Sequence, residues 1–355
     1  MNRLEYKTQR TSLGNHSEQS REPVFGEVYG TKNAIIYFDY AEKVYNQWPS
    51  PDCIISDGPY GVSGFPGDNH KPESLADWYE PHIRTWTEKS TPQTTLWFWN
   101  TEVGWATVHP VLVAHGWEYR CCNIWDKGLG HIAGNANTKT LRKFPIVTEV
   151  CAHYVKAAEF KINDATATMQ EWLRYEWKRT KLPFRLTNEA CGVLNAATRK
   201  YFTSDHLWYY PPVDAFVKIA EYANRHGDPA GRPYFSIDGK YPVSGEQWAK
   251  MRAKFYCNVG ITNIWREPQV SGAERIQGTR NGMQYKFRSL HGSQKPLKFI
   301  KLIIESSTDE GDVVWEPFGG LCPGAVVSSQ LHRRYYAAEI IPEFYLAATE
   351  RLTGP

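Results

Sequence analysis

Short apolar runs and segments of helical spacing alternate over much of the chain. Five runs are rich in β-branched and aromatic residues and predict buried strands, at residues 34–38, 53–55, 95–99, 119–125 and 146–150. Between some of them, residues 78–88 and 103–115 carry apolar side chains every three to four positions, which predicts helices. Strands that alternate with helices favour a mostly parallel sheet covered on both faces.

The same alternation returns near the C-terminal end. Residues 296–306 and 342–352 predict helices, and residues 313–315 and 335–339 predict strands. The predicted fold class is therefore α/β, with a doubly wound, mostly parallel sheet.

The pattern changes in the middle of the chain. Residues 165–180 and 219–225 have helical spacing, but residues 227–283 are irregular and rich in Gly and Pro. We therefore expect one α/β domain that a largely helical module interrupts. The predicted boundaries are a polar N-terminal arm at 1–30, the first half of the domain at 31–156, the module at 157–285 and the second half at 286–355.

Composition narrows the class of protein. The chain of 355 residues has a formal charge of +3 and a pI near 8.3, which permits nucleic acid as a partner without arguing for it. Its seven cysteines form no C-x-x-C pair, so neither a disulfide framework nor a metal site is expected. No apolar stretch suits a signal peptide or a membrane span. We therefore expect a cytoplasmic protein without a membrane partner.

One predicted strand end has the features of a nucleoside site. The strand at 313–315 runs into Glu316-Pro317-Phe318-Gly319-Gly320, where glycines let a ligand approach the backbone and the next helix begins. A second strand ends at Glu339, whose carboxylate is placed to accept hydrogen bonds from a ribose diol. The G-x-G-x-x-G of a dinucleotide site is missing, so S-adenosylmethionine fits better. By itself, a glycine turn of purely structural use explains the pattern equally well.

A second strand end carries Asp57-Gly58-Pro59-Tyr60, after the apolar run at 53–55. Together the two ends resemble the amino-methylating DNA methyltransferases, whose catalytic motif has the form (D/N/S)-P-P-(Y/F/W). Further segments resemble that family's motifs: Phe38-Asp39 its "G-D", Trp125-Asp126-Lys127 its "W-x-K", Thr148-Glu149 its "H-E", His291 to Pro296 its "H-P-T-Q-K-P", and Glu316 to Gly320 its "D-P-F-x-G". The catalytic motif precedes the cofactor motif, as in the family's β group, whose members act on DNA.

The resemblance implies a seven-stranded Rossmann-like methyltransferase sheet, S-adenosylmethionine as cofactor and double-stranded DNA as partner. It also implies a prokaryotic cell or its phage as the source. It places Asp39 near the cofactor's adenine, Glu316, Gly319 and Gly320 around its methionyl part, and Glu339 on its ribose. The other cofactor-site residues that it implies are Asp57, Pro317, Phe318, Ser293, Gln294 and Lys295. Lys295 suits a solvated helix cap equally well, and Pro317 and Phe318 suit a role in shaping the loop.

The four residues of the second strand end suit chemistry on a base amine. Asp57 and the carbonyl of Gly58 are expected to accept the two N–H groups, so that the nitrogen lone pair is freed to attack the methyl group. Pro59 fixes φ, so that Tyr60 is placed to stack on a base swung out of the duplex. Gly58 departs from the usual proline and is expected to loosen the turn. The competing interpretation is an Asx-type turn with a surface tyrosine.

Two segments are candidates for DNA contacts. Residues 186–193 and 195–201 resemble a helix-turn-helix, in which Asn195, Thr198, Arg199 and Lys200 would face bases and phosphates. A small structural helix pair explains the same pattern. The Gly-rich basic loop at 127–143 is the second candidate, with Lys139, Arg142 and Lys143 either on the DNA backbone or on a solvated face.

The sequence thus predicts a DNA amino-methyltransferase of the restriction-modification or solitary type. Asp57 favours adenine N6 as the target, and cytosine N4 is the alternative. Two other hypotheses are a catalytically idle, cofactor-dependent DNA-binding protein and an RNA methyltransferase. A homodimer and a cognate restriction endonuclease are protein partners that the sequence leaves open.

Overall fold

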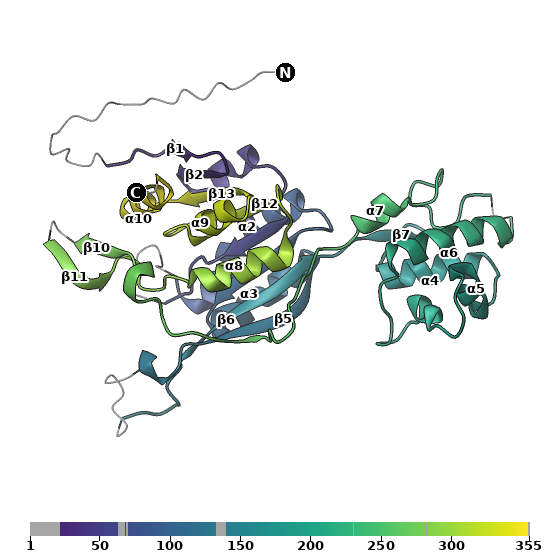
Figure 1. The fold of residues 1–355 in the computed structure, drawn as a ribbon, viewed down its shortest axis with the longest axis horizontal. Coiled ribbons are helices and arrows are strands. Elements are labelled where there is room, and N and C mark those ends of the chain that lie inside the picture. The colour runs from purple at the N-terminus through teal and green to yellow at the C-terminus, as the bar shows by residue number, and fades with distance from the viewer. Residues whose placement is uncertain are drawn as a thin grey trace, which may run out of the picture.

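A large twisted sheet forms the centre of the molecule (Figure 1). The computed structural model describes residues 22–62, 68, 70–132, 140–229, 231–280 and 283–353. Within these residues the main sheet has nine strands, in the order β1-β2-β13-β12-β3-β4-β6-β5-β9. Their bounds are β1 Glu27–Gly30, β2 Ala34–Phe38, β3 Cys53–Ser56, β4 Thr95–Asn100, β5 Trp117–Asp126, β6 Thr148–Lys156, β9 Ile264–Arg266, β12 Val313–Glu316 and β13 Arg334–Glu339.

Strands β2, β13, β12, β3 and β4 are mutually parallel, and β6 lies antiparallel between β4 and β5. The predicted α/β class with a mostly parallel sheet is confirmed. The sheet is wider than the seven strands expected, because the short strands β1 and β9 extend its two edges. Strand β1 also means that the last residues of the predicted loose arm are ordered against β2.

Helices cover both faces of the sheet, because strand side chains alternate between the two faces. On one face, Ile55 of β3 and Trp97 of β4 pack with the helices of the second half. On the other face, Ile54 and Leu96 pack with the helices of the first half. The first group is α8 Leu297–Ser307, α9 Pro323–Gln330 and α10 Pro342–Thr353, and the second is α1 Ala41–Val44, α2 Leu75–Lys89 and α3 Glu102–Ala114.

The two motif-bearing strands are neighbours in the sheet. Strand β12 pairs with β3 through Val314 opposite Cys53 and Trp315 opposite Ile54. Because both strands run in the same direction, Asp57 and Glu316 leave the sheet at the same carboxyl edge. This is the edge at which doubly wound sheets bind ligands.

The inserted module forms a separate helical body with its own hydrophobic core, whose buried residues all lie between Phe160 and Trp248. Its elements are β7 Phe160–Ile162, β8 Ala165–Ala167, α4 Met169–Arg179, α5 Thr187–Cys191, α6 Val213–His226 and α7 Gly245–Ala249. The chain then returns to the sheet as β9 and forms a hairpin from β10 Gln277–Arg280 and β11 Met283–Ser289. The separate module is therefore shorter than the predicted 157–285.

The module leaves the sheet at the amino edge, opposite the motif-bearing ends. Strand β6 runs antiparallel to its neighbours, and its end at Lys156 pairs with Trp117, where β5 begins. Strands β4 and β6 pair over six residues, so the two edges of the sheet are about 20 Å apart. Figure 1 shows the module on one side of the sheet and the β10–β11 hairpin on the other.

Candidate active site

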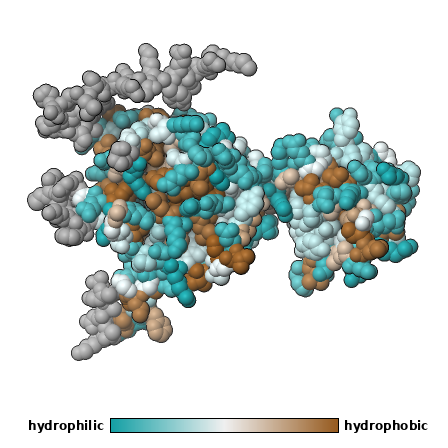
Figure 2. Space-filling model, viewed as in Figure 1, coloured by the Kyte–Doolittle hydropathy of each residue, from teal (hydrophilic) through white to brown (hydrophobic). Residues whose placement is uncertain are grey.

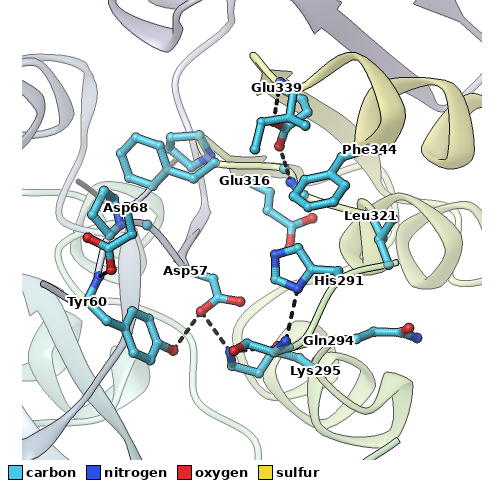
Figure 3. Close-up of a pocket in the computed structure, with 18 of the residues that line it drawn as sticks. Asp57, Tyr60, Asp68, His291, Gln294, Lys295, Glu316, Leu321, Glu339 and Phe344 are labelled. Carbon is cyan, nitrogen blue, oxygen red and sulfur yellow. Dashed lines mark hydrogen bonds and ion pairs between the residues drawn. The ribbon is translucent and has the colours of Figure 1, made fainter. Parts of the chain in front are cut away.

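One cavity of about 560 Å³ opens at the carboxyl edge of the sheet. It is lined by every residue predicted for catalysis or cofactor binding, from Asp39, Asp57–Tyr60, Ser293–Lys295, Glu316–Gly320 and Glu339. Figure 3 shows Asp57, Lys295 and Glu316 around one space. The volume lies within the range of small-molecule sites. The two motifs, far apart in the sequence, therefore form one site.

The Asp57 carboxylate is anchored through one of its two oxygens. Its Oδ1 accepts a hydrogen bond of 2.7 Å from the Tyr60 hydroxyl and lies 2.9 Å from the ammonium of Lys295. Within the described part of the chain, Oδ2 has no hydrogen-bond partner. One oxygen thus fixes the orientation of the carboxylate, and the other is left to accept a proton donor in the cavity.

Lys295 belongs to a chain of four alternating charges. Its ammonium lies 3.3 Å from Oε2 of Glu149, and Glu149 also pairs with Lys127. Burial lowers the pKa of Lys295, but the carboxylates of Asp57 and Glu149 raise it by more, so its pKa lies above the ordinary value. Burial raises the pKa of Glu149, and the two lysines outweigh this, so its pKa is lowered. Lys295 and Glu149 therefore both stay charged although they are buried.

The sequence predicts two members of this chain of charges, Asp57 and Lys295, as site residues. Lys127 and Glu149 lie in segments that resemble family motifs, but neither had been assigned to the site. They come from the facing ends of β5 and β6, which a loop of about twenty residues separates in the sequence. Lys295 was expected either on the cofactor or in solvent, and its buried ion pairs exclude a solvated helix cap.

Gly58 occupies a position where no larger residue fits. A Cβ atom built on Gly58 would lie 2.6 Å from Cδ2 of Phe318 and 2.6 Å from the hydroxyl of Tyr79. The next carbonyl, of Pro59, accepts hydrogen bonds of 3.1 Å from Tyr79 and 3.1 Å from the side-chain amide of Asn100. The turn is therefore held by its surroundings, which argues against the expected loosening by glycine; the effect of Gly58 on activity stays a prediction.

Asp68 holds the chain on the other side of Tyr60. Its buried carboxylate accepts hydrogen bonds from the backbone N–H groups of Tyr60 at 2.8 Å, Gly61 at 3.2 Å and Val62 at 3.0 Å. A carboxylate bonded to several backbone N–H groups is a strong local clamp. No sequence pattern indicates this role, because Asp68 follows the motif by several residues and belongs to none of the family segments.

Tyr60 does not project freely from the corner. Its hydroxyl donates to Asp57, and the ammonium of Lys295 lies 5.2 Å from the centre of its ring. Burial raises the pKa of Tyr60 well above its ordinary value, so the hydroxyl stays protonated. This geometry excludes the surface tyrosine of the competing Asx-turn interpretation. Stacking of its ring on a base stays a prediction.

The glycine bend shapes the opposite wall of the cavity. Glu316 is buried at the end of β12, where its Oε2 accepts hydrogen bonds from Gly324 N at 3.1 Å and from the Tyr335 hydroxyl. Burial raises its pKa to about 8. At Gly319 a Cβ would lie 2.7 Å from Cys322 Sγ, and Gly320 has a φ of +52°. Both glycines are therefore required by the bend.

Glu339 is bonded to the backbone around it. Its Oε1 accepts from Ile340 N at 2.9 Å and Ile341 N at 2.7 Å, and its Oε2 accepts from Gly320 N at 2.6 Å. Burial raises its pKa to about 7. Each carboxylate oxygen can accept about two hydrogen bonds. Oε2 therefore retains capacity for a hydroxyl donor, and the ribose role stays a prediction.

Other predicted cofactor residues have structural partners. Gln294 uses both ends of its amide, donating to Glu274 O at 2.8 Å and accepting from Ile276 N at 3.2 Å. Phe318 packs its ring 5.2 Å from Trp78, so it shapes the loop as the sequence allowed. Asp39 pairs with Lys43 at 3.2 Å. Of these three, Asp39 has the most exposed partner, with Lys43 62% exposed, so its carboxylate exchanges that partner most easily.

The predicted helix-turn-helix is wrong in its second helix. Helix α5 ends at Gly192, whose φ is +68°, but Asn195 also has a positive φ of +54° and only a 3-10 helix follows at Thr198–Phe202. Thr198 is buried and shares a 2.8 Å hydrogen bond with Thr187, so it is not available to DNA. Asn195 and Arg199 are exposed and Lys200 is half-buried. They lie on the module, which leaves the sheet at the edge opposite Asp57, and their contacts with DNA stay a prediction.

The basic loop, in contrast, borders the cavity. Arg142 and Lys143 are exposed, and Ile146 and Thr148, which follow them, line the cavity. Lys139 lies outside the described residues. The DNA-contact predictions for Arg142 and Lys143 therefore remain compatible with the site.

The described residues contain neither a metal site nor a membrane-spanning helix. Among the described residues, no group of His, Cys, Asp and Glu is arranged to hold a metal ion. In the same part of the chain, no helix has the length and apolar character needed to span a bilayer.

Fold and site together define an α/β protein in which two segments line one cavity: the glycine bend, Glu316–Gly320, and the acid-and-ring corner, Asp57–Tyr60. Residues 51–350 match the model of the family described as DNA methylase, which comprises N6 and N4 methyltransferases. The chain belongs to this family. The predicted family resemblance is confirmed.

Individual relatives match only part of the chain. The type II methyltransferase M2.MboI of Moraxella bovis is 30% identical over 111 residues, 31% of this chain and 32% of its own length. M.BglII of Bacillus subtilis is 36% identical over 66 residues, 19% of this chain and 18% of its own. M.Cfr9I of Citrobacter freundii is 36% identical over 90 residues, 25% and 30% of the two chains. The matched segments thus span about a third or less of these relatives.

Solved structures share the fold at low sequence identity. PvuII DNA methyltransferase, described as cytosine-N4-specific, aligns with a TM-score of 0.50 and 11% identity over 93% of this chain and 94% of its own. The M1.HpyAVI–SAM complex aligns with a TM-score of 0.46 and 15% identity over 89% and 98% of the two chains.

Proposed function

We propose that the protein transfers a methyl group from S-adenosylmethionine to the exocyclic amine of a base extruded from double-stranded DNA. One observation carries this proposal: Asp57, whose Oδ2 has no hydrogen-bond partner in the described part of the chain, and the glycine bend after Glu316 line the same cavity. The family supports an amino group of adenine or cytosine as the target. Asp57 in the motif favours adenine N6, and cytosine N4 is the alternative.

The residues present fit the cofactor. The bend at Gly319 and Gly320 offers a backbone cradle, and among the described residues the hydrogen-bond partners of the buried Glu316 carboxylate are Gly324 N and the Tyr335 hydroxyl, neither of them a cation. Burial disfavours the ionised form of Glu316, and the positive charge of a sulfonium or ammonium group next to it would stabilise that form. When bound, S-adenosylmethionine supplies an electrophilic methyl group, and the electron pair of the broken S–CH₃ bond stays on sulfur.

The protein's own groups would orient the amine. Oδ2 of Asp57 accepts one amine N–H, and the carbonyl of Gly58 accepts the other. The nitrogen lone pair then points away from both acceptors and toward the methyl carbon. After transfer, the nitrogen sheds a proton, which Oδ2 of Asp57 is placed to receive and pass to solvent. Such orientation is worth up to about 7–11 kcal/mol of the barrier in favourable cases.

The ion chain would hold the Asp57 carboxylate in the orientation that the amine needs. Lys295 fixes Oδ1 and stabilises the carboxylate, and Glu149 and Lys127 neutralise the remaining charge. The contacts around the turn argue against the catalytically idle alternative, because Tyr79 and Asn100 hold the Pro59 carbonyl next to Gly58. That alternative would need only cofactor and DNA binding.

The decisive experiment combines methyl transfer with base identification. Purified protein is incubated with labelled S-adenosylmethionine and either duplex DNA or structured RNA, and the digested nucleosides are separated and weighed. We expect label in duplex DNA, as N6-methyladenine. N4-methylcytosine would reverse the base assignment, label in RNA alone would refute the DNA proposal, and binding of both ligands without transfer would support the idle alternative.

The raised pKa of Glu316 predicts a pH dependence of cofactor binding. Its carboxyl has a pKa of about 8 in the free protein, so binding a cation below pH 8 must release a proton. Affinity for S-adenosylmethionine should therefore rise with pH up to about 8, by at most about tenfold per pH unit. Calorimetry from pH 6 to 8, in buffers that differ in their enthalpy of ionisation, measures both the affinity and the number of protons released on binding.

The variant Glu316→Gln keeps the shape and removes the titration. It should bind more weakly at pH 8 and have a shallower slope between pH 7 and 8, where Glu339, with a pKa of about 7, still titrates in both proteins. Thr349→Ser, at a half-buried hydroxyl on α10 that does not line the cavity, is a control that should match the wild type. A slope that persists unchanged in Glu316→Gln would exclude Glu316 as the titrating group.

A further inference from the structure

The segment between β5 and β6 has an unusual charge pattern. Between Asp126 and Glu149 the sequence contains four Lys or Arg residues and no Asp or Glu. Its two ends lie in the active site, where Lys127 and His131 at one end and Thr148 at the other line the cavity. A basic segment that borders the site is suited to a polyanionic partner.

The returning part of this segment also exposes large apolar side chains. Phe144 is 95% exposed, directly after the exposed Arg142 and Lys143, and Leu129 on the outgoing part is 79% exposed. Figure 1 shows the segment projecting beyond the sheet, and Figure 2 shows brown, apolar residues beside the grey atoms at the lower left. A ring that is 95% exposed packs against almost nothing in the fold and is free to contact a partner.

Phe144 lies close to the cavity mouth. Ile146, two residues later, lines the cavity, and two residues of extended chain span about 7 Å. Pro145 lies between them and fixes its own φ, and it also restricts Phe144 to extended backbone. The ring is therefore presented by a stiff stretch of chain at the edge of the site.

An extruded base leaves a gap in the stack, and unstacking costs a few kcal/mol. Proteins that distort DNA often insert an apolar side chain between base steps, while Lys and Arg bind the adjacent phosphates. Phe144 with Arg142 and Lys143 has this combination of groups. The basic flanks favour duplex DNA over a protein as the occupant of this surface.

We propose that Phe144 is a wedge that enters the duplex at the position vacated by the target base, while Arg142 and Lys143 bind the flanking phosphates. This inference rests on the proposed function and deepens it. It assigns duplex opening to a residue outside the cavity, and it separates that task from the chemistry at Asp57.

The test compares substrates that do and do not need a wedge. Once the recognition sequence is mapped, kcat/KM is measured on a normal duplex with one site and on the same duplex with an abasic position opposite the target. Phe144→Ala should lose about 30- to 100-fold on the normal duplex and less than about threefold on the abasic one, where little unpairing energy remains. Phe144→Trp should retain most activity on both.

A spectroscopic readout tests the wedge independently of turnover. With 2-aminopurine at the target position and S-adenosylhomocysteine present, wild type should raise the fluorescence on the normal duplex, and Phe144→Ala should not. Leu194→Ala, which removes a 93% exposed apolar side chain on the module, should match the wild type in both assays. Arg142→Ala with Lys143→Ala should weaken both substrates alike and reduce the salt slope of binding by about 2.

The outcomes separate the two proposals. Phe144→Ala with wild-type kcat/KM and fluorescence on the normal duplex would overturn the wedge and leave the proposed function intact. Equal losses on the normal and abasic duplexes would also overturn it, because they would indicate a general binding or folding role. A wild type that methylates neither duplex would instead refute the proposed function.

Discussion

Asp57→Ala is expected to abolish methyl transfer, with kcat lowered by about a thousandfold or more, which corresponds to about 4 kcal/mol of transition-state stabilisation. The substitution removes the acceptor that orients the amine and receives its proton. It also leaves Lys295 with Glu149 as its only carboxylate partner in the described part of the chain. The measurement is single-turnover transfer from labelled S-adenosylmethionine to duplex DNA.

Asp57→Asn is the informative companion of this variant. Asparagine retains an oxygen acceptor but not the negative charge, so it should keep more activity than alanine and lose its pairing with Lys295. Calorimetric binding of S-adenosylmethionine and thermal unfolding show whether either variant is folded. Equal methyl incorporation by wild type and Asp57→Ala would remove Asp57 from the mechanism.

Gly58→Pro, which restores the residue usual in the family, is expected to lower activity by about a hundredfold rather than raise it. Any residue with a Cβ at position 58 collides with Phe318 and with the Tyr79 hydroxyl, each at 2.6 Å. Overpacking of this kind typically costs about 1–3 kcal/mol of stability. Because Phe318 adjoins the glycine bend, the collision should also displace the cofactor wall.

The collision can be tested by making room for it. Gly58→Ala should be impaired, and adding Tyr79→Phe and Phe318→Leu should recover part of the activity, since these changes remove the atoms in conflict. Gly30→Ala is a matched control, because a Cβ there meets nothing within 4 Å. If Gly58→Pro is as active as the wild type or more so, the packing explanation for this glycine is wrong.

The arrangement of the molecule divides its tasks between two edges of the sheet. The cavity, the basic segment with Phe144 and the β10–β11 hairpin lie at the carboxyl edge, while the helical module lies at the amino edge. Base-specific contacts next to the target are therefore expected from the carboxyl-edge segments. The module's Asn195 and Arg199 remain candidates only for contacts with DNA farther from the target.

Local patterns in the sequence were sufficient for the fold class and for most of the site residues. Strand and helix periodicities are properties of neighbouring residues, so the runs at 53–55 and 313–315 were found as strands β3 and β12. The rule that ligands bind at carboxyl ends of parallel strands then placed Asp57 and Glu316 together. The second helix of the predicted helix-turn-helix failed because a left-handed turn at Asn195 outweighs helical composition.

Long-range packing decided what no local pattern could contain. The sequence alone determined that an α/β domain carries an acid-and-ring corner and a glycine bend. Only the tertiary structure placed β3 beside β12, set Lys295 between Asp57 and Glu149, and filled the space beside Gly58 with Phe318 and Tyr79. These contacts join segments far apart in the chain. Their geometry depends on packing and burial, which sequence periodicity does not describe.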